Sequence, residues 1–224
     1  MDELIIPRPD DFAALADADA QRVRTSVLEK LAADSARYLS EYSERFENVL
    51  NADDAAALFG EYNADRARYR VAVHPAATWV RDELFRRALA EAPVDDTRRV
   101  VFTAGGNAVG KSSALAYSQA RHWAHVVFDS TFSGPAHARH LVDKALAADW
   151  PITVVHIDRR LEDAFLSMLE RSRREGRVVG IEQMIHSHRG AAETVRGLVN
   201  EFRHDALRFP LSCQFCAGRA GELD

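Results

Sequence analysis

The sequence predicts an α/β fold, in which helices flank a parallel sheet and a helical N-terminal region precedes it. From Val100 onward, short apolar runs rich in β-branched residues alternate with helical patterns, which is typical of a parallel sheet. Before that point, apolar residues recur every three or four positions, the spacing of helices that bury one face. We therefore expect a helical region over residues 1–95 and an α/β domain over residues 96–224.

The composition is that of a soluble globular protein. Hydrophobic residues make up 47% of the 224 residues and charged residues 28%, which excludes wholesale disorder. The net charge of −5 disfavours a general nucleic-acid or membrane-surface binder. Because the N-terminus is acidic and no apolar run approaches the length of a membrane span, we expect a cytoplasmic protein with no secretory signal and no membrane partner.

Two long helices are predicted in the N-terminal region. The clearest covers residues 21–50, where apolar residues line one face and charged residues fill the other, and Asn51 is expected to end it. The second is expected to begin near Pro75, because proline suits the first position of a helix, and to stop before Pro93.

In the α/β domain, a helix is expected after each strand. Strands are expected over residues 99–103, 125–129 and 152–157, and helices over residues 112–123, 135–148, 161–174 and 181–202. A last apolar segment contains Pro210, which would place it at a sheet edge or break it. Its C-x-x-C pair, Cys213 and Cys216, has no second pair to complete a zinc site, so we expect reduced thiols there.

A glycine-bearing loop follows the first predicted strand. Residues 98–113 read RRVVFTAGGNAVGKSS, in which Gly105, Gly110, Lys111 and Ser112 fit the pattern G-x-x-x-x-G-K-[ST]. Glycine permits backbone angles that turn successive N–H groups toward one anion, and the next helix adds its unpaired N–H groups. Lysine can reach a terminal phosphate, and the serine hydroxyl can bind the Mg²⁺ of a nucleoside triphosphate. The strand before and the helix after this phosphate-binding loop (P-loop) favour a P-loop NTPase-type sheet.

The residues expected to bind ATP and Mg²⁺ are those of this loop and of the helix start. They are Gly105, Gly106, Asn107, Ala108, Val109, Gly110, Lys111, Ser112 and Ser113.

Asp129 is the most informative acid because it ends a predicted strand of the same sheet. Ligands of parallel sheets bind at the carboxyl ends of strands, so Asp129 should face the same crevice as Lys111. Three roles stay open: a ligand of Mg²⁺, a general base that takes a proton from a substrate hydroxyl, or a cap of the following turn. Ser130 and Thr131 are candidates for substrate contact.

A basic segment, RSRREGR, covers residues 171–177. Arg171, Arg174 and Arg177 lie three apart and would share one side of a helix. Arginine suits phosphate oxygens, and positive charge over the transferring group favours phosphoryl transfer. Nearby glycines fit a mobile lid, whereas neighbouring glutamates fit a solvated face. We expect Arg171 and Arg177 to be catalytic.

The order of these features resembles the zeta-toxin family of P-loop kinases. Beyond the phosphate loop, the resemblance is carried by FDSTF at residues 128–132, by ADWPITVVHIDRRLEDAFLSMLERSRREGR at residues 148–177, and by the helix that follows. Zeta toxins are the toxic halves of bacterial toxin–antitoxin pairs, and they use ATP to phosphorylate a hydroxyl of a UDP-N-acetyl sugar. The resemblance implies ATP and Mg²⁺, a small-molecule acceptor and an antitoxin protein as partner.

The resemblance also implies residue roles. Lys111 would contact the terminal phosphate, Ser112 the Mg²⁺, and residues 129–131 the substrate, while Arg171 and Arg177 look like the lid arginines. The family usually has a further strand, ending in an Asp that serves as base, between the loop helix and the FDSTF motif. Here only about a dozen residues separate Ser113 from His125, so either Asp129 is the base, or the substrate differs, or the activity is lost.

The predicted function is therefore that of a kinase in which Asp129 activates an acceptor hydroxyl and Lys111 and arginines neutralise the phosphoryl group. A first alternative is a kinase with the same catalytic residues and another acceptor: an antibiotic, a nucleotide cofactor or a nucleic-acid end. The acidic net charge disfavours the nucleic-acid end. A second rival binds ATP without transferring phosphate. A third hypothesis concerns regulation, with the helix over residues 21–50 mimicking an antitoxin in cis.

Overall fold

The chain divides into two compact units, each described by itself. The computed structural model describes residues 4–91, 98–117, 119–175, 179–202 and 212–217. The N-terminal unit comprises Met1–Ala90 and the C-terminal unit Glu91–Asp224.

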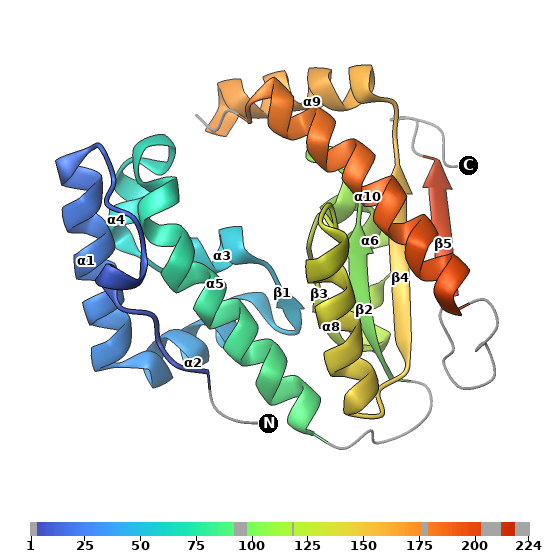
Figure 1. The fold of residues 1–224 in the computed structure, drawn as a ribbon, viewed down its shortest axis with the longest axis horizontal. Helices are drawn as coiled ribbons and strands as arrows, with labels where there is room; N and C mark the ends of the chain where they lie inside the picture. Colours follow the sequence, from blue (N-terminus) through green and yellow to red (C-terminus); the bar gives the residue numbers. More distant parts are fainter. Residues whose placement is uncertain (1–3, 92–97, 118, 176–178, 203–211, 218–224) are drawn as a thin grey trace. The chain divides into compact units, whose positions relative to one another are not determined.

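The N-terminal unit is a cluster of helices built on one long helix, α5 (Figure 1). Its elements are a 3-10 turn at Pro9–Asp11, α1 (Ala18–Ala33), α2 (Ser35–Phe46), the short strand β1 (Val49–Leu50), α3 (Ala52–Ala56), α4 (Gly60–Ala64) and α5 (Arg66–Ala90). Helices α1, α2, α3 and α4 all contact α5. Apolar residues of α1 and α5, among them Val27, Leu31 and Val80, are fully buried. The helical N-terminal region is thus confirmed.

The prediction of one helix over residues 21–50 is wrong. The chain breaks at Asp34, whose backbone N–H still bonds Lys30 O while its carboxylate accepts the N–H of Arg37 at 3.2 Å. Asp34 therefore ends α1 and caps α2. The spacing of the apolar residues does not reveal this break, because it depends on hydrogen bonds between the Asp34 side chain and the backbone. Asn51, expected as a helix stop, instead caps the start of α3 by accepting the N–H of Asp53 at 2.7 Å.

The predicted start of the second long helix is also wrong. Helix α5 begins at Arg66, and Pro75 lies inside it. The carboxylate of Asp65 accepts the N–H of Arg68 at 3.0 Å, so an acidic residue ahead of the first turn supplies the cap.

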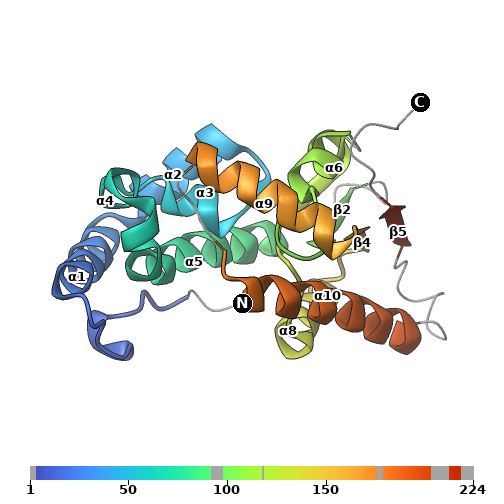
Figure 2. The same ribbon diagram turned by 90° about the horizontal axis from the view of Figure 1, so that it is seen from above.

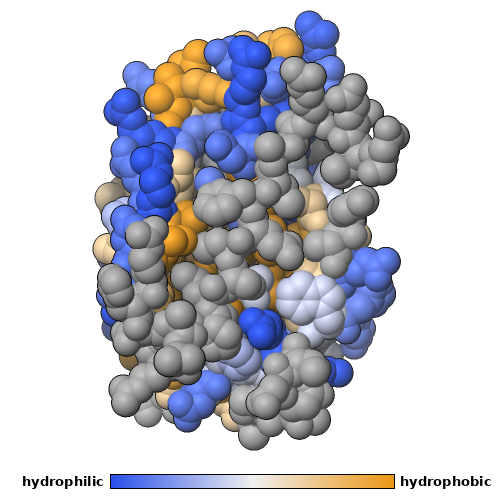
Figure 3. Space-filling view, turned by 90° about the vertical axis from the view of Figure 1, so that its right-hand side faces the viewer, coloured by the Kyte–Doolittle hydropathy of each residue, from blue (hydrophilic) through white to orange (hydrophobic). Residues whose placement is uncertain are grey.

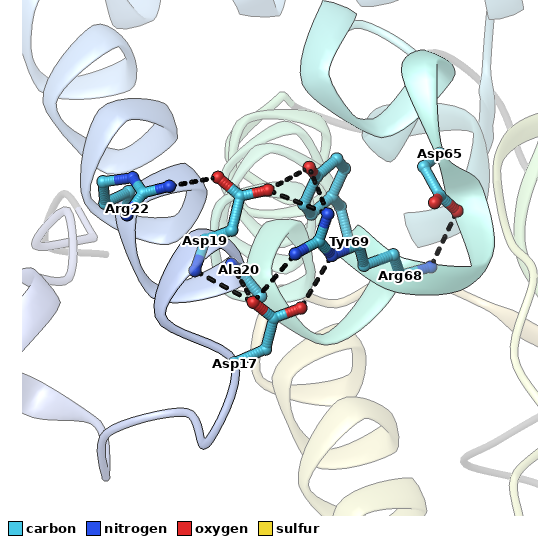
Figure 4. Close-up of polar contacts among 7 residues, drawn as sticks. All are labelled: Asp17, Asp19, Ala20, Arg22, Asp65, Arg68 and Tyr69. Carbon is cyan, nitrogen blue, oxygen red and sulfur yellow. Dashed lines mark hydrogen bonds and ion pairs between the residues drawn. The ribbon is translucent and has the colours of Figure 1, made fainter.

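A surface network joins the starts of α1 and α5 (Figure 4). Asp17 caps α1 and accepts from Arg68 Nε at 2.7 Å, while Asp19 accepts from the Tyr69 hydroxyl at 2.5 Å. The hydrogen bond from Arg68, helped by backbone N–H groups, lowers the pKa of the Asp17 carboxyl to about 2. Because these side chains are exposed, the network orders two helix ends but adds little to stability.

A buried carboxylate fastens the N-terminal segment to α5. The Glu83 side chain is 0% exposed and lies 2.7 Å from Arg86 and 2.9 Å from Arg87. Burial alone would raise its pKa, but these hydrogen bonds and one from the backbone of Leu4 hold the Glu83 pKa at about 2. Trp79 Nε1 donates to Leu4 O at 3.2 Å, so both backbone groups of Leu4 bond to α5.

Four parallel strands form the sheet of the C-terminal unit. They are β2 (Arg99–Ala104), β3 (Ala124–Phe128), β4 (Ile152–Asp158) and β5 (Ser212–Ala217), arranged in the order β3-β2-β4-β5. The α/β fold class and the first three predicted strands are confirmed. The last predicted strand exists as β5, which begins after Pro210; that proline lies outside the described residues.

Helices cover both faces of this sheet. They are α6 (Lys111–Tyr117), α7 (Ala120–Trp123), α8 (Pro135–Ala147), α9 (Leu161–Glu175) and α10 (Ile181–Phe202). Helices α8 and α10 lie on one face and α6 on the other, and α9 lies beyond the carboxyl ends of the strands (Figures 1 and 2). The helix predicted over residues 112–123 is divided, because Gln119 adopts a left-handed conformation with φ of 52°.

Apolar side chains are exposed on α9 and α10. Leu166, Leu169, Ile181 and Ile185 are all exposed. Figure 3 shows hydrophobic residues at the top of its face, the end at which α9 lies in Figure 1. Among the described helices, none is both long enough and apolar enough to cross a membrane.

Candidate phosphate-binding site

The glycine loop lies between β2 and α6. Gly105 and Gly110 adopt φ of 144° and 98°, and Ala108 between them adopts 61°. A Cβ on Gly105 would lie 2.7 Å from Ile157 O of β4, so backbone conformation and close packing both require glycine there. These positive φ values, all within residues 105–110, are typical of backbone turns that bind anions.

Lys111 folds back over the start of this loop. Its Nζ donates to Gly105 O at 3.2 Å and to Gly106 O at 3.1 Å. Those contacts hold the ammonium group at the loop itself. Ser112 and Ser113, in the first turn of α6, are exposed.

The glycine loop lies where the connections from two neighbouring strands, β2 and β4, run to opposite sides of the sheet. The chain leaving β2 leads to β3 on one side, whereas the chain leaving β4 leads to β5 on the other. In parallel sheets, a crevice for ligands forms at the carboxyl ends of two such neighbouring strands. The close approach of Gly105 to Ile157 O places the loop at this crevice.

Asp129 follows β3 directly and is joined to the end of β2. Its side chain is 8% exposed, and its Oδ1 accepts from the Thr103 hydroxyl at 2.6 Å. Thr103 Oγ1 in turn accepts the N–H of Ser130 at 3.1 Å. A backbone bond from Gly105 N to Thr131 O, 3.1 Å long, ties the acidic segment to the glycine loop. The structure thus brings Lys111 and Asp129 to one edge of the sheet.

Local contacts shape the turn after Asp129. Phe132 has φ of 53°, its ring lies 5.3 Å from that of Phe102, and its N–H donates to Ser130 Oγ at 3.3 Å. The hydroxyls of Thr131 and Ser133 lie 3.0 Å apart. Ser130 and Thr131, both predicted to contact substrate, are half-buried.

Helix α10 packs directly on both loops, which the sequence reasoning did not anticipate. The Ser187 hydroxyl accepts from Asn107 N at 3.1 Å and from Asn107 Nδ2 at 3.0 Å, and His188 Nε2 lies 3.2 Å from Asn107 O. Farther along, a Cβ on Gly190 would lie 2.2 Å from Ser133 O. The predicted nucleotide contact Asn107 thus directs its backbone N–H toward α10.

The predicted arginines are described only in part. Arg171 is exposed on α9, and the Arg174 side chain and all of Arg177 lie outside the described residues, so the catalytic roles of Arg171 and Arg177 stay predictions. A further arginine, Arg159, follows the carboxyl end of β4. Its guanidinium donates to Ser167 Oγ at 3.0 Å, while its buried Nε has no hydrogen-bond partner among the described residues.

The sequence reasoning also passed over Thr103 and Ser187. Thr103 is a polar residue near the end of an apolar strand, and the same kind of position pointed to Asp129.

Among the described residues, no group of three or more His, Cys, Asp or Glu could hold a metal ion.

One family model, described as Zeta toxin, matches residues 120–209. The match covers less than half of the 224 residues, and this part of the chain is similar to the zeta toxin family. The family resemblance is thereby confirmed for this part of the chain. The zeta toxin region contains Asp129, its following turn, α8, α9 and α10, whereas the glycine loop and Lys111 precede it. No curated protein matches the chain.

The zeta toxin family indicates a P-loop kinase-like function. Within the matched region lie the residues that hold the loop from outside it: Thr131 bonds Gly105, and Ser187 and His188 contact Asn107.

Proposed function

We propose that the chain transfers the γ-phosphoryl group of ATP to a hydroxyl of a small molecule, the acceptor being a UDP-N-acetyl sugar. The observation that carries the proposal is the Lys111 ammonium lying on Gly105 O and Gly106 O, in a loop bonded to the segment that bears Asp129. A cation and a nearly buried acid lie at the same edge of the sheet, the edge where ligands of this fold class bind. The acceptor class rests on the zeta toxin family.

In this proposal, the amides of the loop and Lys111 bind the triphosphate. The acceptor hydroxyl attacks the γ-phosphorus, and its proton passes to the Asp129 carboxylate. A new O–P bond forms while the bond from the γ-phosphorus to the bridging oxygen breaks, and ADP leaves. Such transfer depends mainly on positioning and on charge stabilisation, so few side chains suffice.

Mg²⁺ would be held by oxygen donors at this edge. The Ser112 hydroxyl and the Asp129 carboxylate are the donor types that Mg²⁺ prefers, and it would neutralise charge on the phosphates when bound. Since Thr103 donates to Asp129 Oδ1, this hydroxyl orients the carboxylate for either role, metal ligand or base. Arg171 and Arg177 would add positive charge over the transferred group.

The test uses the purified chain of residues 1–224 with Mg²⁺ and γ-labelled ATP. Acceptors are UDP-N-acetyl sugars, an aminoglycoside, a nucleoside cofactor and an oligonucleotide with a free 5′ hydroxyl. We expect label in the UDP-sugar only, and none with Lys111→Ala, whose thermal melting should match the wild type because Lys111 is partly exposed.

Each outcome of this test has one meaning. Label in another acceptor keeps the kinase and rejects the UDP-sugar, whereas ATP binding without transfer to any acceptor supports the non-catalytic regulator. Absence of ATP binding by calorimetry contradicts the whole proposal. If a UDP-sugar is the acceptor, expression in bacteria should arrest cell-wall synthesis, Lys111→Ala should relieve the arrest, and a neutralising antitoxin is the expected partner.

A further inference from the structure

We infer that Ser187 and His188 of α10 are positioning residues for the phosphate loop. The two residues, which we call the α10 clamp, hold both backbone polar groups of Asn107. Ser187 Oγ accepts the Asn107 N–H at 3.1 Å, and His188 Nε2 lies 3.2 Å from Asn107 O. This inference rests on the proposed function only for its catalytic consequence.

The Ser187 hydroxyl is fully engaged. Its side chain is 3% exposed, it donates to Met184 O at 2.9 Å, and it accepts two hydrogen bonds from Asn107. A buried hydroxyl with one donated and two accepted bonds has a single orientation. The position of Asn107 is therefore fixed by α10, eighty residues later in the chain.

The His188 ring adds a steric contact to its hydrogen bond. A Cβ on Gly106 would lie 2.1 Å from His188 Cδ2, so the ring occupies the space beside Gly106. Gly106 lacks a positive φ, so a side chain at this position would be opposed by the His188 ring, which would have to move, and not by backbone conformation. The ring and the Gly106 backbone thus fit together as one packed contact.

The clamp acts on the outside of the loop. Because Asn107 gives its N–H to Ser187, this amide is turned toward α10. The amides from Ala108 onward follow it and would then be ordered toward the phosphates. An ordered loop lowers the entropy lost on binding, so the clamp should act on nucleotide affinity more than on the chemical step.

The first experiment measures hydrogen exchange of residues 104–112 in nucleotide-free protein. Ser187→Ala should raise exchange at Asn107 about 2- to 10-fold, the loss expected for one hydrogen bond. Thr194→Val is the matched control, because Thr194 carries another buried hydroxyl of α10, is 3% exposed, and has no partner for its Oγ1 within the part of the chain that the structure describes. It should leave loop exchange unchanged. Unchanged exchange in both Ser187→Ala and His188→Ala would overturn the inference.

The second experiment tests the packed contact by a double-mutant cycle on the same exchange readout. Gly106→Ala should displace the His188 ring and loosen the loop, whereas in the His188→Ala background the added methyl group should have a much smaller effect. His188→Gln, which keeps a donor near the position of Nε2, should retain most of the protection. Strictly additive effects would contradict a direct role of the ring.

The third experiment separates the clamp from the proposed function. In Ser187→Ala, the Kd for Mg·ATP should rise about 2- to 10-fold with a smaller change in kcat. If the wild type binds no nucleotide while Ser187→Ala still loosens the loop, the clamp stands and the kinase proposal fails. If nucleotide binds equally to the wild type and to Ser187→Ala, and loop exchange is also equal, the kinase stands and the clamp fails.

Discussion

At the scale of single residues, Asp129 and Thr103 form the contact on which the chemistry would depend. Thr103 is 0% exposed, and its hydroxyl donates to Asp129 while accepting the N–H of Ser130. One hydroxyl thus fixes both the acid and the backbone after it. Two substitutions separate the roles of the pair.

Asp129→Asn should lower kcat by about 10²–10⁴-fold, the usual contribution of a general base. The amide keeps the shape of the carboxylate and still accepts from Thr103, so the fold should be retained. ATP affinity should change little, as measured by calorimetry with Mg²⁺. Equal losses in affinity and turnover would instead identify Asp129 as the Mg²⁺ ligand.

Thr103→Val should destabilise the protein by about 1–3 kcal/mol, because it leaves the buried Asp129 carboxylate and the Ser130 N–H without this partner. Turnover should fall as the carboxylate loses its orientation. Thr103→Ser restores the hydroxyl and should recover most of the activity. Urea unfolding and the transfer assay give the two readouts. An active Thr103→Val protein would show that the orientation of Asp129 does not matter.

At this scale, the sequence predicted residues whose signal is local. The glycine loop, Lys111 and Asp129 are marked by their neighbours in the chain, and the structure brings them to one edge of the sheet. Ser187 and His188 carry no such mark, because their partner Asn107 lies about eighty residues away. Long-range pairing of this kind leaves no periodic trace in a single sequence.

At the scale of elements, α10 is the helix that joins the two loops of the site. It contacts the glycine loop through Ser187 and His188, and the turn after Asp129 through Gly190. Its position therefore sets the separation between the glycine loop and the turn after Asp129.

Two glycines of α10 should respond to alanine in opposite directions. Gly190→Ala should destabilise the protein by about 1–3 kcal/mol, because its Cβ would meet the backbone oxygen of Ser133, which no side-chain rotation relieves. Gly197→Ala is the control on the same helix, where a Cβ meets nothing within 4 Å. It should be neutral or stabilise by up to about 1 kcal/mol, since alanine favours helices. Thermal melting of both proteins measures this, and equal effects would show that α10 is not in contact with Ser133.

The order of elements followed from the sequence, but helix breaks did not. Alternating apolar runs predicted β2, β3 and β4 because buried parallel strands are continuous in hydrophobicity. The break at Asp34 was not predicted because the apolar residues keep their helical spacing on both sides of it. A single aspartate there ends α1 and caps α2. The break at Gln119 depends on a left-handed residue of a type that seldom adopts that conformation.

At the scale of the whole molecule, the two units differ in what stabilises them. The C-terminal unit is a conventional sheet with helices on both faces. The N-terminal unit relies in part on one buried ionised carboxyl, that of Glu83, whose pKa is lowered to about 2. Acid should therefore weaken the N-terminal unit in particular.

Glu83 provides the sharpest test of this pH dependence. Its pKa falls from an ordinary 4.5 to about 2 in the folded chain, so its contribution is complete above about pH 5 and disappears as the pH falls toward 2. The contribution is at most about 3 kcal/mol, because Arg87 is half exposed and solvent screens the pair. Glu83→Gln should unfold at lower urea than the wild type at pH 7, and the gap should narrow to about half or less at pH 3, where the folded-state carboxyl is still mostly ionised.

Circular dichroism during urea unfolding at pH 7, 5 and 3 measures this gap. Glu29→Gln, which changes an exposed glutamate of α1, is the control and should follow the wild type at each pH. If the gap between wild type and Glu83→Gln stays constant from pH 7 to pH 3, the charge on Glu83 is not what holds α5 to the N-terminal segment. The hydrogen bond from Trp79 to Leu4 would then have to hold that contact by itself.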